Sequence, residues 1–234
     1  YRAAITDTSF QRAFGFTVLF AVVSILSINI LAFALAVLLT QKLRGTNVFR
    51  TVFFMPNLIG GIVLGYIWQI LINCVMTILE QPLLALNATA GYWGLIILMG
   101  WQQIGYMMII YIAGLQNVPD SLIEAAEIDG AGKLQRFFKI TIPLVRPTMI
   151  ILVLLAVGGI FRGNFDLFYN LIGTNGTLYD VTDVIDTFTF RALINNNDIG
   201  MAAASGFFQS VLCFVTVIFA NRLVSSYDKD YALF

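Results

Sequence analysis

The sequence contains no histidine and few charged side chains. Among its 234 residues, 13 are basic and 13 are acidic, which gives a formal net charge of zero and a charged fraction of only 11%. Without histidine the chain lacks the usual metal ligand, the usual proton relay at neutral pH and the base of Ser-His or Cys-His catalysis. A net charge of zero also gives no overall field that would attract nucleic acid or acidic substrates.

Cysteine is scarce as well, and a nucleotide-binding loop is missing. Cys74 and Cys213 lie in different apolar stretches at different expected depths, so we expect no disulfide. The run DGAGK at 129–133 superficially resembles a phosphate-binding loop. However, Glu127 stands where that pattern needs its first glycine and Leu134 where it needs a hydroxyl, so the pattern is not met.

Apolar side chains, by contrast, are abundant. Hydrophobic residues make up 59% of the chain and the mean hydropathy is +0.86, whereas about a quarter of a soluble domain is charged. Five stretches are long enough to cross a bilayer, which takes about 20 helical residues. We therefore predict an all-α, polytopic membrane helix bundle that forms one domain over residues 1–234. Its expected spans are 14–39, 51–73, 92–115, 147–171 and 199–223.

The basic residues are unevenly distributed between the two sides of these spans. Nine lie in the 40–50 loop, the 116–146 loop and the C-terminal tail, whereas three lie in the N-terminal segment and the other loops. Because basic loops favour the cytoplasmic side, we expect the 116–146 loop and the C-terminus to be cytoplasmic. Tyr1 then lies outside, so we expect at least one further span to precede it in the full protein.

The 117–146 segment interrupts the apolar chain with an acidic helix, a glycine turn and a basic helix. Pro119 fits a first helical turn, and Ser121 with Glu124 fits a capping box. Two glycines, of which Gly130 is the first, are expected to end the acidic helix. The basic helix carries its charges at three-residue spacing, and we expect its apolar side to lie against the bundle. The segment predicts a helical hairpin that binds a partner or, alternatively, an amphipathic loop on the membrane surface.

This segment resembles the EAA loop of bacterial ABC importer permeases, the binding-protein-dependent transport inner-membrane components. The matching residues are Glu124, Ala125, Ala126, Gly130, Ile140 and Pro143, and Ile142 replaces the usual leucine. The resemblance implies a type I importer transmembrane domain, whose hairpin is held in a groove of a separate ATPase subunit. The ATPase-coupling residues that it implies are Glu124, Ala125, Ala126, Asp129, Gly130, Lys133 and Arg136.

The same resemblance implies partners and a location. The chain is expected to pair with a second homologous permease, two ATPase subunits and an extracellular or periplasmic solute-binding protein in the bacterial cell membrane. It is expected to be a transport subunit and no enzyme. No cofactor is expected in this chain, because ATP and magnesium would bind to the ATPase subunits. Closure of the two ATPases would switch the cavity from inward-facing to outward-facing.

Further residues resemble the carbohydrate-uptake branch, similar to the maltose permease large subunit. The runs 129–131 and 138–144 carry this resemblance, and the 179–191 stretch resembles a subgroup of LplB or YteP type that is linked to complex oligosaccharides. The implied function is the import of a sugar, expected to be an oligosaccharide. The alternatives are an ABC importer for a non-sugar solute such as an amino acid or phosphate, and an ATP-independent secondary carrier. A membrane enzyme would need a catalytic constellation, and none is apparent.

Several polar residues lie inside the expected spans, where they are costly unless they face a cavity or a partner. Amide, carboxylate and aromatic side chains suit the hydroxyls and apolar ring faces of sugars. By resemblance, Asn57 and the 163–165 stretch fall on sugar-contacting positions. The candidate cavity residues are Asn57, Gly61, Gln102, Gln103, Tyr106, Arg162, Asn164 and Asp166.

The same residues also have structural alternatives. Gly61 is followed four residues later by Gly65, which would allow a close helix approach. Gln102 and Gln103 cannot both face one cavity, so at least one is expected to bond a neighbouring helix. Arg162 and Asp166 are four residues apart and are expected to neutralise each other, although Arg162 could instead bind an acidic sugar.

Overall fold

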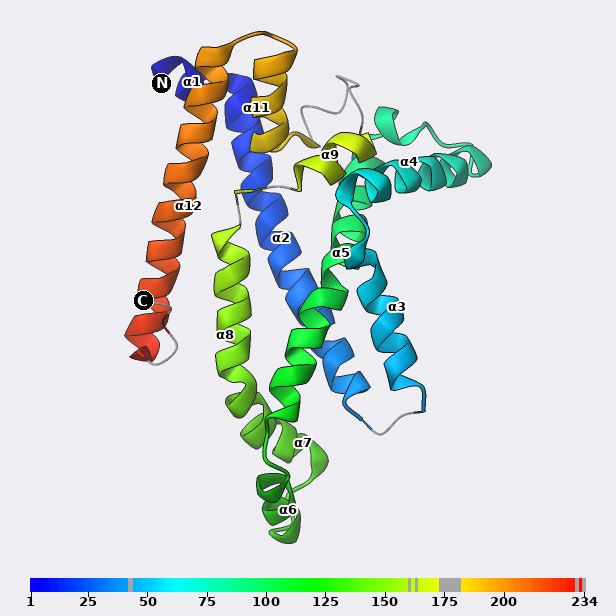
Figure 1. Ribbon diagram of the computed structural model, residues 1–234, viewed down its shortest axis with the longest axis vertical. Helices are drawn as coiled ribbons and strands as arrows, with labels where there is room; N and C mark the ends of the chain where they lie inside the picture. Colours follow the sequence, from blue (N-terminus) through cyan, green and yellow to red (C-terminus); the bar gives the residue numbers. More distant parts are fainter. Residues whose placement is uncertain (42–43, 160, 163, 173–181, 230–231, 233–234) are drawn as a thin grey trace.

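The computed structural model describes residues 1–41, 44–159, 161–162, 164–172, 182–229 and 232. Throughout these ranges the chain is helical or irregular and contains no strand, which confirms the all-α prediction. Figure 1 shows the arrangement of the elements. They are α1 (Arg2–Thr6), α2 (Thr8–Leu39), α3 (Thr46–Leu58), α4 (Gly61–Ile78), η1 (Leu84–Leu86), α5 (Ala88–Gln116), α6 (Asp120–Ile128), α7 (Lys133–Arg136), η2 (Phe137–Thr141), α8 (Ile142–Gly158), α9 (Phe165–Ile172), α11 (Ile185–Ile194) and α12 (Ile199–Tyr227).

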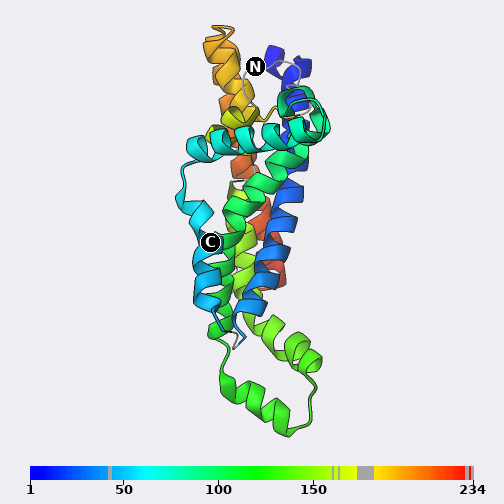
Figure 2. The same cartoon turned by 90° about the vertical axis from the view of Figure 1, so that its right-hand side faces the viewer.

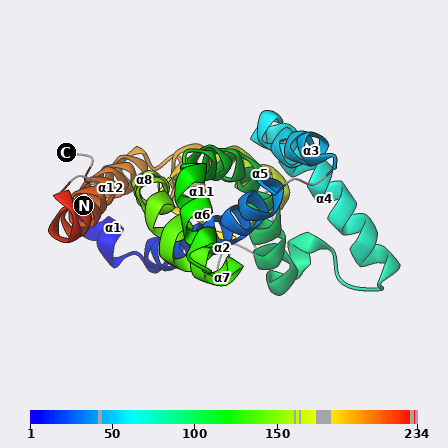
Figure 3. The same cartoon turned by 90° about the horizontal axis from the view of Figure 1, so that it is seen from below.

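The long helices α2, α5, α8 and α12 run along the long axis of the molecule (Figure 1). Viewed from below, α12 and α4 lie at opposite ends of an elongated outline, with α2, α5 and α8 between them (Figure 3). In the described part of the chain, five helical stretches are long and apolar enough to cross a membrane: α2, α4, 89–116, 133–158 and α12. The molecule is therefore a polytopic membrane helix bundle.

The structure divides the expected 51–73 span into two helices. α3 ends at Leu58, Ile59 is extended with φ −85° and ψ 129°, and α4 starts after Gly60. Pro56 contributes to this break because it has no N–H and its ring crowds the carbonyl four residues earlier. Figures 1 and 2 both show α4 lying across the long axis, so α3 and α4 do not form one continuous crossing.

The structure also divides the expected 147–171 span into two helices, and the first of them begins before residue 147. α8 ends at Gly158 and α9 begins only at Phe165. On its N-terminal side, α8 continues a helical path that starts at Lys133 and passes through the π-helical turn η2. The wider π turn ends at Thr141, two residues before Pro143, and such turns adapt a helix to an interrupted hydrogen-bond ladder.

Small residues bring the long helices close together. Ala32 and Ala36 of α2 are fully buried beside Met108 of α5 and Leu152 of α8. α3 approaches α5 at Gly105 so closely that an added Cβ would lie 1.9 Å from the carbonyl oxygen of Phe53. Close backbone approach at small residues is the usual way in which membrane helices associate.

At the end of the molecule opposite the hairpin, hydrogen bonds seat α11 against α2 and α12. The Ile185 amide donates to Thr17 Oγ1 at 3.1 Å, and Thr189 and Ser205 share a hydrogen bond of 2.8 Å. Asp183 is 5% exposed and forms a bidentate ion pair with Arg191. Residues 179–181 of the stretch that resembles the LplB or YteP subgroup lie outside the described residues.

Candidate functional site

A helical hairpin projects beyond one end of the bundle. It consists of α6, the turn at 129–132, and α7 with η2 (Figures 1 and 2). Arg146, at the base of α8 next to it, donates a hydrogen bond of 2.5 Å to the hydroxyl of Tyr227 at the end of α12. The hairpin and the C-terminal end of α12 therefore lie on the same side of the bundle.

The glycine turn has the geometry of a Schellman motif. Gly130 has φ +80°, its N–H bonds Glu127 O at 3.0 Å, and the Ala131 N–H bonds Ala126 O at 2.9 Å. This confirms the predicted glycine stop. At the start of α6, by contrast, the predicted capping box is not formed: the cap position is Pro119, without a side-chain cap.

One ion pair fastens the two arms of the hairpin together. Arg136 Nη1 lies 2.8 Å from Glu127 Oε2, with side-chain exposures of 14% and 67% respectively. The other predicted coupling residues, Glu124, Ala125, Asp129 and Lys133, are exposed, whereas Ala126 is half-buried. The charged side chains of Glu124, Asp129 and Lys133 are thus available to contact a partner protein.

The apolar side of the hairpin faces outward rather than against the bundle. Ile128 is 87% exposed, Leu134 is 74% exposed and Phe138 is 61% exposed. One residue of the predicted apolar side does reach the bundle. Among the described ring contacts, the ring centroid of Phe137 lies 6.3 Å from that of Phe33 on α2. The prediction that this side packs on the bundle was wrong for Leu134 and Phe138, because the hairpin extends away from the helices that could have covered them (Figures 1 and 2).

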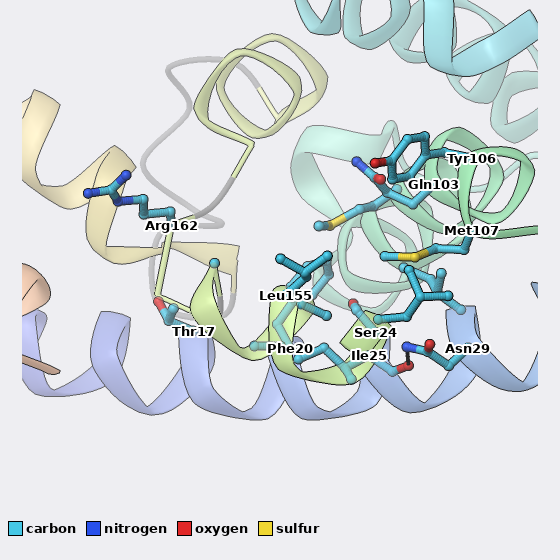
Figure 4. Close-up of a pocket in the computed structure, with 16 residues that line it drawn as sticks. Thr17, Phe20, Ser24, Ile25, Asn29, Gln103, Tyr106, Met107, Leu155 and Arg162 are labelled. Atoms are coloured by element: carbon cyan, nitrogen blue, oxygen red, sulfur yellow. Dashed lines mark hydrogen bonds between the residues drawn. The ribbon is translucent and has the colours of Figure 1, made fainter. Parts of the chain in front are cut away.

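A cavity of about 390 Å³ lies between α2, α5 and the C-terminal part of α8 (Figure 4). Its walls are mainly aliphatic, with a few polar groups from three different segments. The lining residues with polar side chains are Thr17, Ser24, Asn29, Gln103, Tyr106 and Arg162. A concave, mostly apolar space with a few convergent polar groups is the usual form of a small-molecule site.

Three of the eight predicted cavity residues line this space: Gln103, Tyr106 and Arg162. Gln102 is 5% exposed and turns away from it. Its Nε2 donates to Ile59 O at 3.4 Å, and its Oε1 accepts a hydrogen bond of 2.9 Å from Asn164 Nδ2. As expected for two neighbouring glutamines on one helix, one faces the cavity and the other bonds neighbouring segments.

The other predicted cavity residues lie outside this space. Asn57 is half-buried on α3 and is not part of the lining. Gly61 packs on the start of α9, where an added Cβ would lie 2.9 Å from Asn164 Oδ1 and 3.2 Å from Asp166 Cβ. Gly65 approaches the same helix, with an added Cβ 3.0 Å from Asn170 Cβ. The two glycines thus provide the close helix approach that their spacing predicts.

The expected pairing of Arg162 with Asp166 was wrong. The four-residue rule holds within a continuous helix, but α8 has ended before Arg162 and α9 begins after it. Asp166 packs against α4 at Gly61, and within the described residues the two side chains form no ion pair. Residue 163, part of the stretch expected to contact sugar, lies outside the described residues.

Sequence reasoning missed the contribution of α2 to the cavity. Thr17, Ser24 and Asn29 all line it, and Ser24 Oγ is buried without a hydrogen-bond partner. Asn29 Oδ1 accepts a hydrogen bond of 2.7 Å from Tyr111, which orients the amide. The available signal was spacing, since residues seven apart, such as 17 and 24, share one helix face.

No site for a metal ion or a disulfide emerges from the described part of the chain. It contains no group of three His, Cys, Asp or Glu side chains that could hold a metal. Cys74 is exposed, Cys213 is half-buried, and both are free.

Comparison with known proteins gives the family. The sequence matches the family described as "Binding-protein-dependent transport system inner membrane component" over residues 44–229. It is 34% identical over 218 residues to the probable starch degradation products transport system permease protein AmyD of Thermoanaerobacterium thermosulfurigenes, covering 90% of this chain and 72% of that protein. It is 30% identical over 228 residues to the sn-glycerol-3-phosphate transport system permease protein UgpA of Agrobacterium fabrum, covering 93% and 75%.

The fold also matches a solved structure. That structure is a bacterial alginate ABC transporter in complex with an alginate pentasaccharide-bound periplasmic protein, with a TM-score of 0.86 at 22% identity over 97% of this chain and 82% of that chain. At this identity the likeness concerns the fold alone. Since the family match spans well over half of the sequence, the chain belongs to the binding-protein-dependent transport system inner membrane components, the permease subunits of ABC transporters.

Proposed function

We propose that this chain is a permease subunit of an ATP-driven importer that moves a sugar, in the form of an oligosaccharide, into the cytoplasm. The sugar comes from an extracellular or periplasmic binding protein and passes through the membrane by alternating access. The names of relatives support this substrate class, because AmyD is described as a transporter of starch degradation products. The fold neighbour, which was solved with a saccharide-bound periplasmic protein, supports the binding-protein partner.

The observation that carries the mechanism is the projecting hairpin with its outward apolar side. Apolar residues such as Ile128 and Leu134 stand in a segment that also presents Glu124 and Lys133. An exposed apolar patch rimmed by charges is typical of a protein interface. We assign the occupant as an ATPase subunit, which binds the ATP and magnesium, and two such subunits serve this chain and a second homologous permease.

The stiffness of the hairpin suits the transmission of movement. The Schellman turn at Gly130 and the Glu127–Arg136 ion pair hold α6 against α7, and the helical path from Lys133 runs on into α8. A displacement of the hairpin would therefore move α8, which forms one wall of the cavity. This connection links ATPase closure to the opening and closing of the cavity.

The orientation in the membrane follows from the basic loops. The hairpin and the end of α12 lie on the same side of the bundle, and the sequence concentrates its basic residues there. We assign that side to the cytoplasm and the α9 and α11 side to the exterior of a bacterial cell membrane. Substrate would then enter the cavity from the end at which α8 terminates.

A second candidate function is the import of a small non-sugar solute. UgpA, a relative with 30% identity, is described as a transporter of sn-glycerol-3-phosphate. The cavity also contains a cationic group, Arg162, that would suit a phosphate or an amino-acid carboxylate. Uptake of labelled glycerol phosphate and amino acids, measured beside oligosaccharides in the same vesicles, separates these substrate classes.

Leu134→Ser in the hairpin tests the proposed function. Leu134 is 74% exposed, so the substitution leaves the fold intact but should abolish co-purification of the ATPase and transport-linked ATP hydrolysis. Glu124→Ala should reduce the same activities. Leu79→Ser, at an apolar residue that is 60% exposed and lies outside the hairpin, is the matched control. ATPase binding that persists in both hairpin variants, or active uptake without any ATPase, would contradict the proposal and favour a secondary carrier.

A further inference from the structure

The lining of the cavity carries one positive charge. Among its 16 lining residues, Arg162 is the only charged one, and it forms no ion pair with a described residue. The nearest acid along the chain, Asp166, packs against Gly61 on α4 instead. Arg162 is exposed at one end of the cavity lining, where its guanidinium can take an anionic partner.

The backbone around Arg162 is fixed from three sides. The Arg162 N–H donates to Gly159 O at 2.9 Å, and Gln209 Nε2 of α12 donates to Phe161 O at 2.5 Å. The Phe161 ring is 6% exposed and stacks on Phe14 of α2 at a centroid distance of 6.0 Å. These contacts hold Arg162 beyond the end of α8 that is remote from the hairpin, at one end of the cavity lining, with its guanidinium pointing away from the other labelled residues (Figure 4).

The remaining polar groups lie along the cavity wall away from the arginine. Figure 4 shows Ser24 and Asn29 on α2 and Gln103 and Tyr106 on α5, with Arg162 apart from them at one end. Ser24 is 4% exposed and its Oγ has no hydrogen-bond partner. A buried hydroxyl without a partner costs free energy, which a ligand hydroxyl in the cavity would recover.

From this distribution we propose that the oligosaccharide carries a carboxylate, which Arg162 binds at the outer end of the cavity. The hydroxyls of the sugar then meet Ser24, Gln103 and Tyr106. A guanidinium presents two parallel N–H groups to a carboxylate, which gives this pairing both strength and a defined geometry. The inference rests on the proposed function and narrows its substrate class to uronic-acid-type oligosaccharides.

The test uses the complete transporter with its binding protein, reconstituted in lipid vesicles. The probes are trigalacturonate, a trisaccharide of mannuronate, a trisaccharide of guluronate, maltotriose, xylotriose and arabinotriose, and the readouts are uptake and binding-protein-stimulated ATP hydrolysis. We expect an acidic trisaccharide to be taken up, and Arg162→Gln to lower that uptake about ten- to a hundredfold, since a hydrogen bond to a charged group is lost. Arg162→Lys should retain part of the uptake, because the charge remains without the paired geometry.

Controls separate this inference from the function on which it rests. Arg2→Gln removes an exposed positive charge from α1, outside the cavity, and should leave uptake unchanged. If only neutral trisaccharides are transported, or if Arg162→Gln transports the acidic one as well as the parent does, the assignment of Arg162 falls while the proposed sugar importer stands. If none of the trisaccharides is transported, the proposed substrate class falls and the inference falls with it.

Discussion

Gln102 of α5 and Asn164, just before α9, are joined by a hydrogen bond of 2.9 Å from Asn164 Nδ2 to Gln102 Oε1. The same glutamine reaches Ile59 O at the break between α3 and α4. Both interrupted segments of the chain are thus tied to one buried side chain. Gln103, its neighbour in the sequence, lines the cavity instead.

Gln102→Leu should therefore lower stability, whereas Gln103→Leu should lower transport. Gln102→Leu leaves the Asn164 amide and a carbonyl without a partner, which should lower the free energy of unfolding by about 1–3 kcal/mol. Gln103→Leu should leave thermal stability in detergent nearly unchanged but weaken substrate uptake. Thermal unfolding and vesicle uptake measured on both variants check this pair, and a stable Gln102→Leu protein would refute the structural role.

Gly105→Ala should disrupt the packing of α3 on α5. The added methyl would lie 1.9 Å from Phe53 O and 2.9 Å from the Cα of Phe54, and neither backbone atom can rotate away. Overpacking in a close-packed interior typically costs about 1–3 kcal/mol. Gly206→Ala is the matched control, because nothing lies within 4 Å of its added Cβ. The yield of folded protein and its unfolding temperature should fall for the first substitution only.

Gly130→Ala should impair the hairpin through backbone strain rather than through a clash. Nothing lies within 4 Å of an added Cβ, but φ is +80°, and an L-residue there costs about 1–2 kcal/mol. Gly132→Ala is the control, since its φ of −66° suits alanine. Coupled ATP hydrolysis should drop for Gly130→Ala alone, and Gly130→Asn should be milder because asparagine tolerates this conformation. Equal activity of the two alanine variants would contradict the role of the turn.

The two Arg–carboxylate pairs found among the described residues, Asp183–Arg191 and Glu127–Arg136, should contribute very differently to stability. Asp183→Ala leaves the partly buried Arg191 without its carboxylate, and breaking such a pair costs about 3–5 kcal/mol. Glu127→Ala removes a carboxylate that is 67% exposed, which should cost only about 0–1 kcal/mol. Thermal unfolding at low and high salt checks both, because salt screens only the exposed pair. Comparable losses in the two variants would show that burial is not the deciding factor.

The sequence by itself determined the membrane bundle and the position of the hairpin. Both depend on local properties: the length of apolar runs, the placement of glycine, and the contrast between a charged segment and its oily surroundings. The stop at Gly130 could be predicted because the left-handed conformation favours glycine whatever lies around it. The same local reasoning failed for the apolar side of the hairpin, since nothing in Leu134 or Phe138 says whether a surface will cover them.

Only the tertiary structure decided where the chain breaks and which polar residues share a space. Pro56 could signal a kink, but the direction of α4 depends on Gly61 and Gly65 packing against α9, more than a hundred residues away in sequence. Ser24 and Arg162 likewise meet one cavity only because α2, α5 and α8 assemble around it. Helix periodicity fixes which residues share a face of one helix, whereas packing between distant helices decides what that face meets.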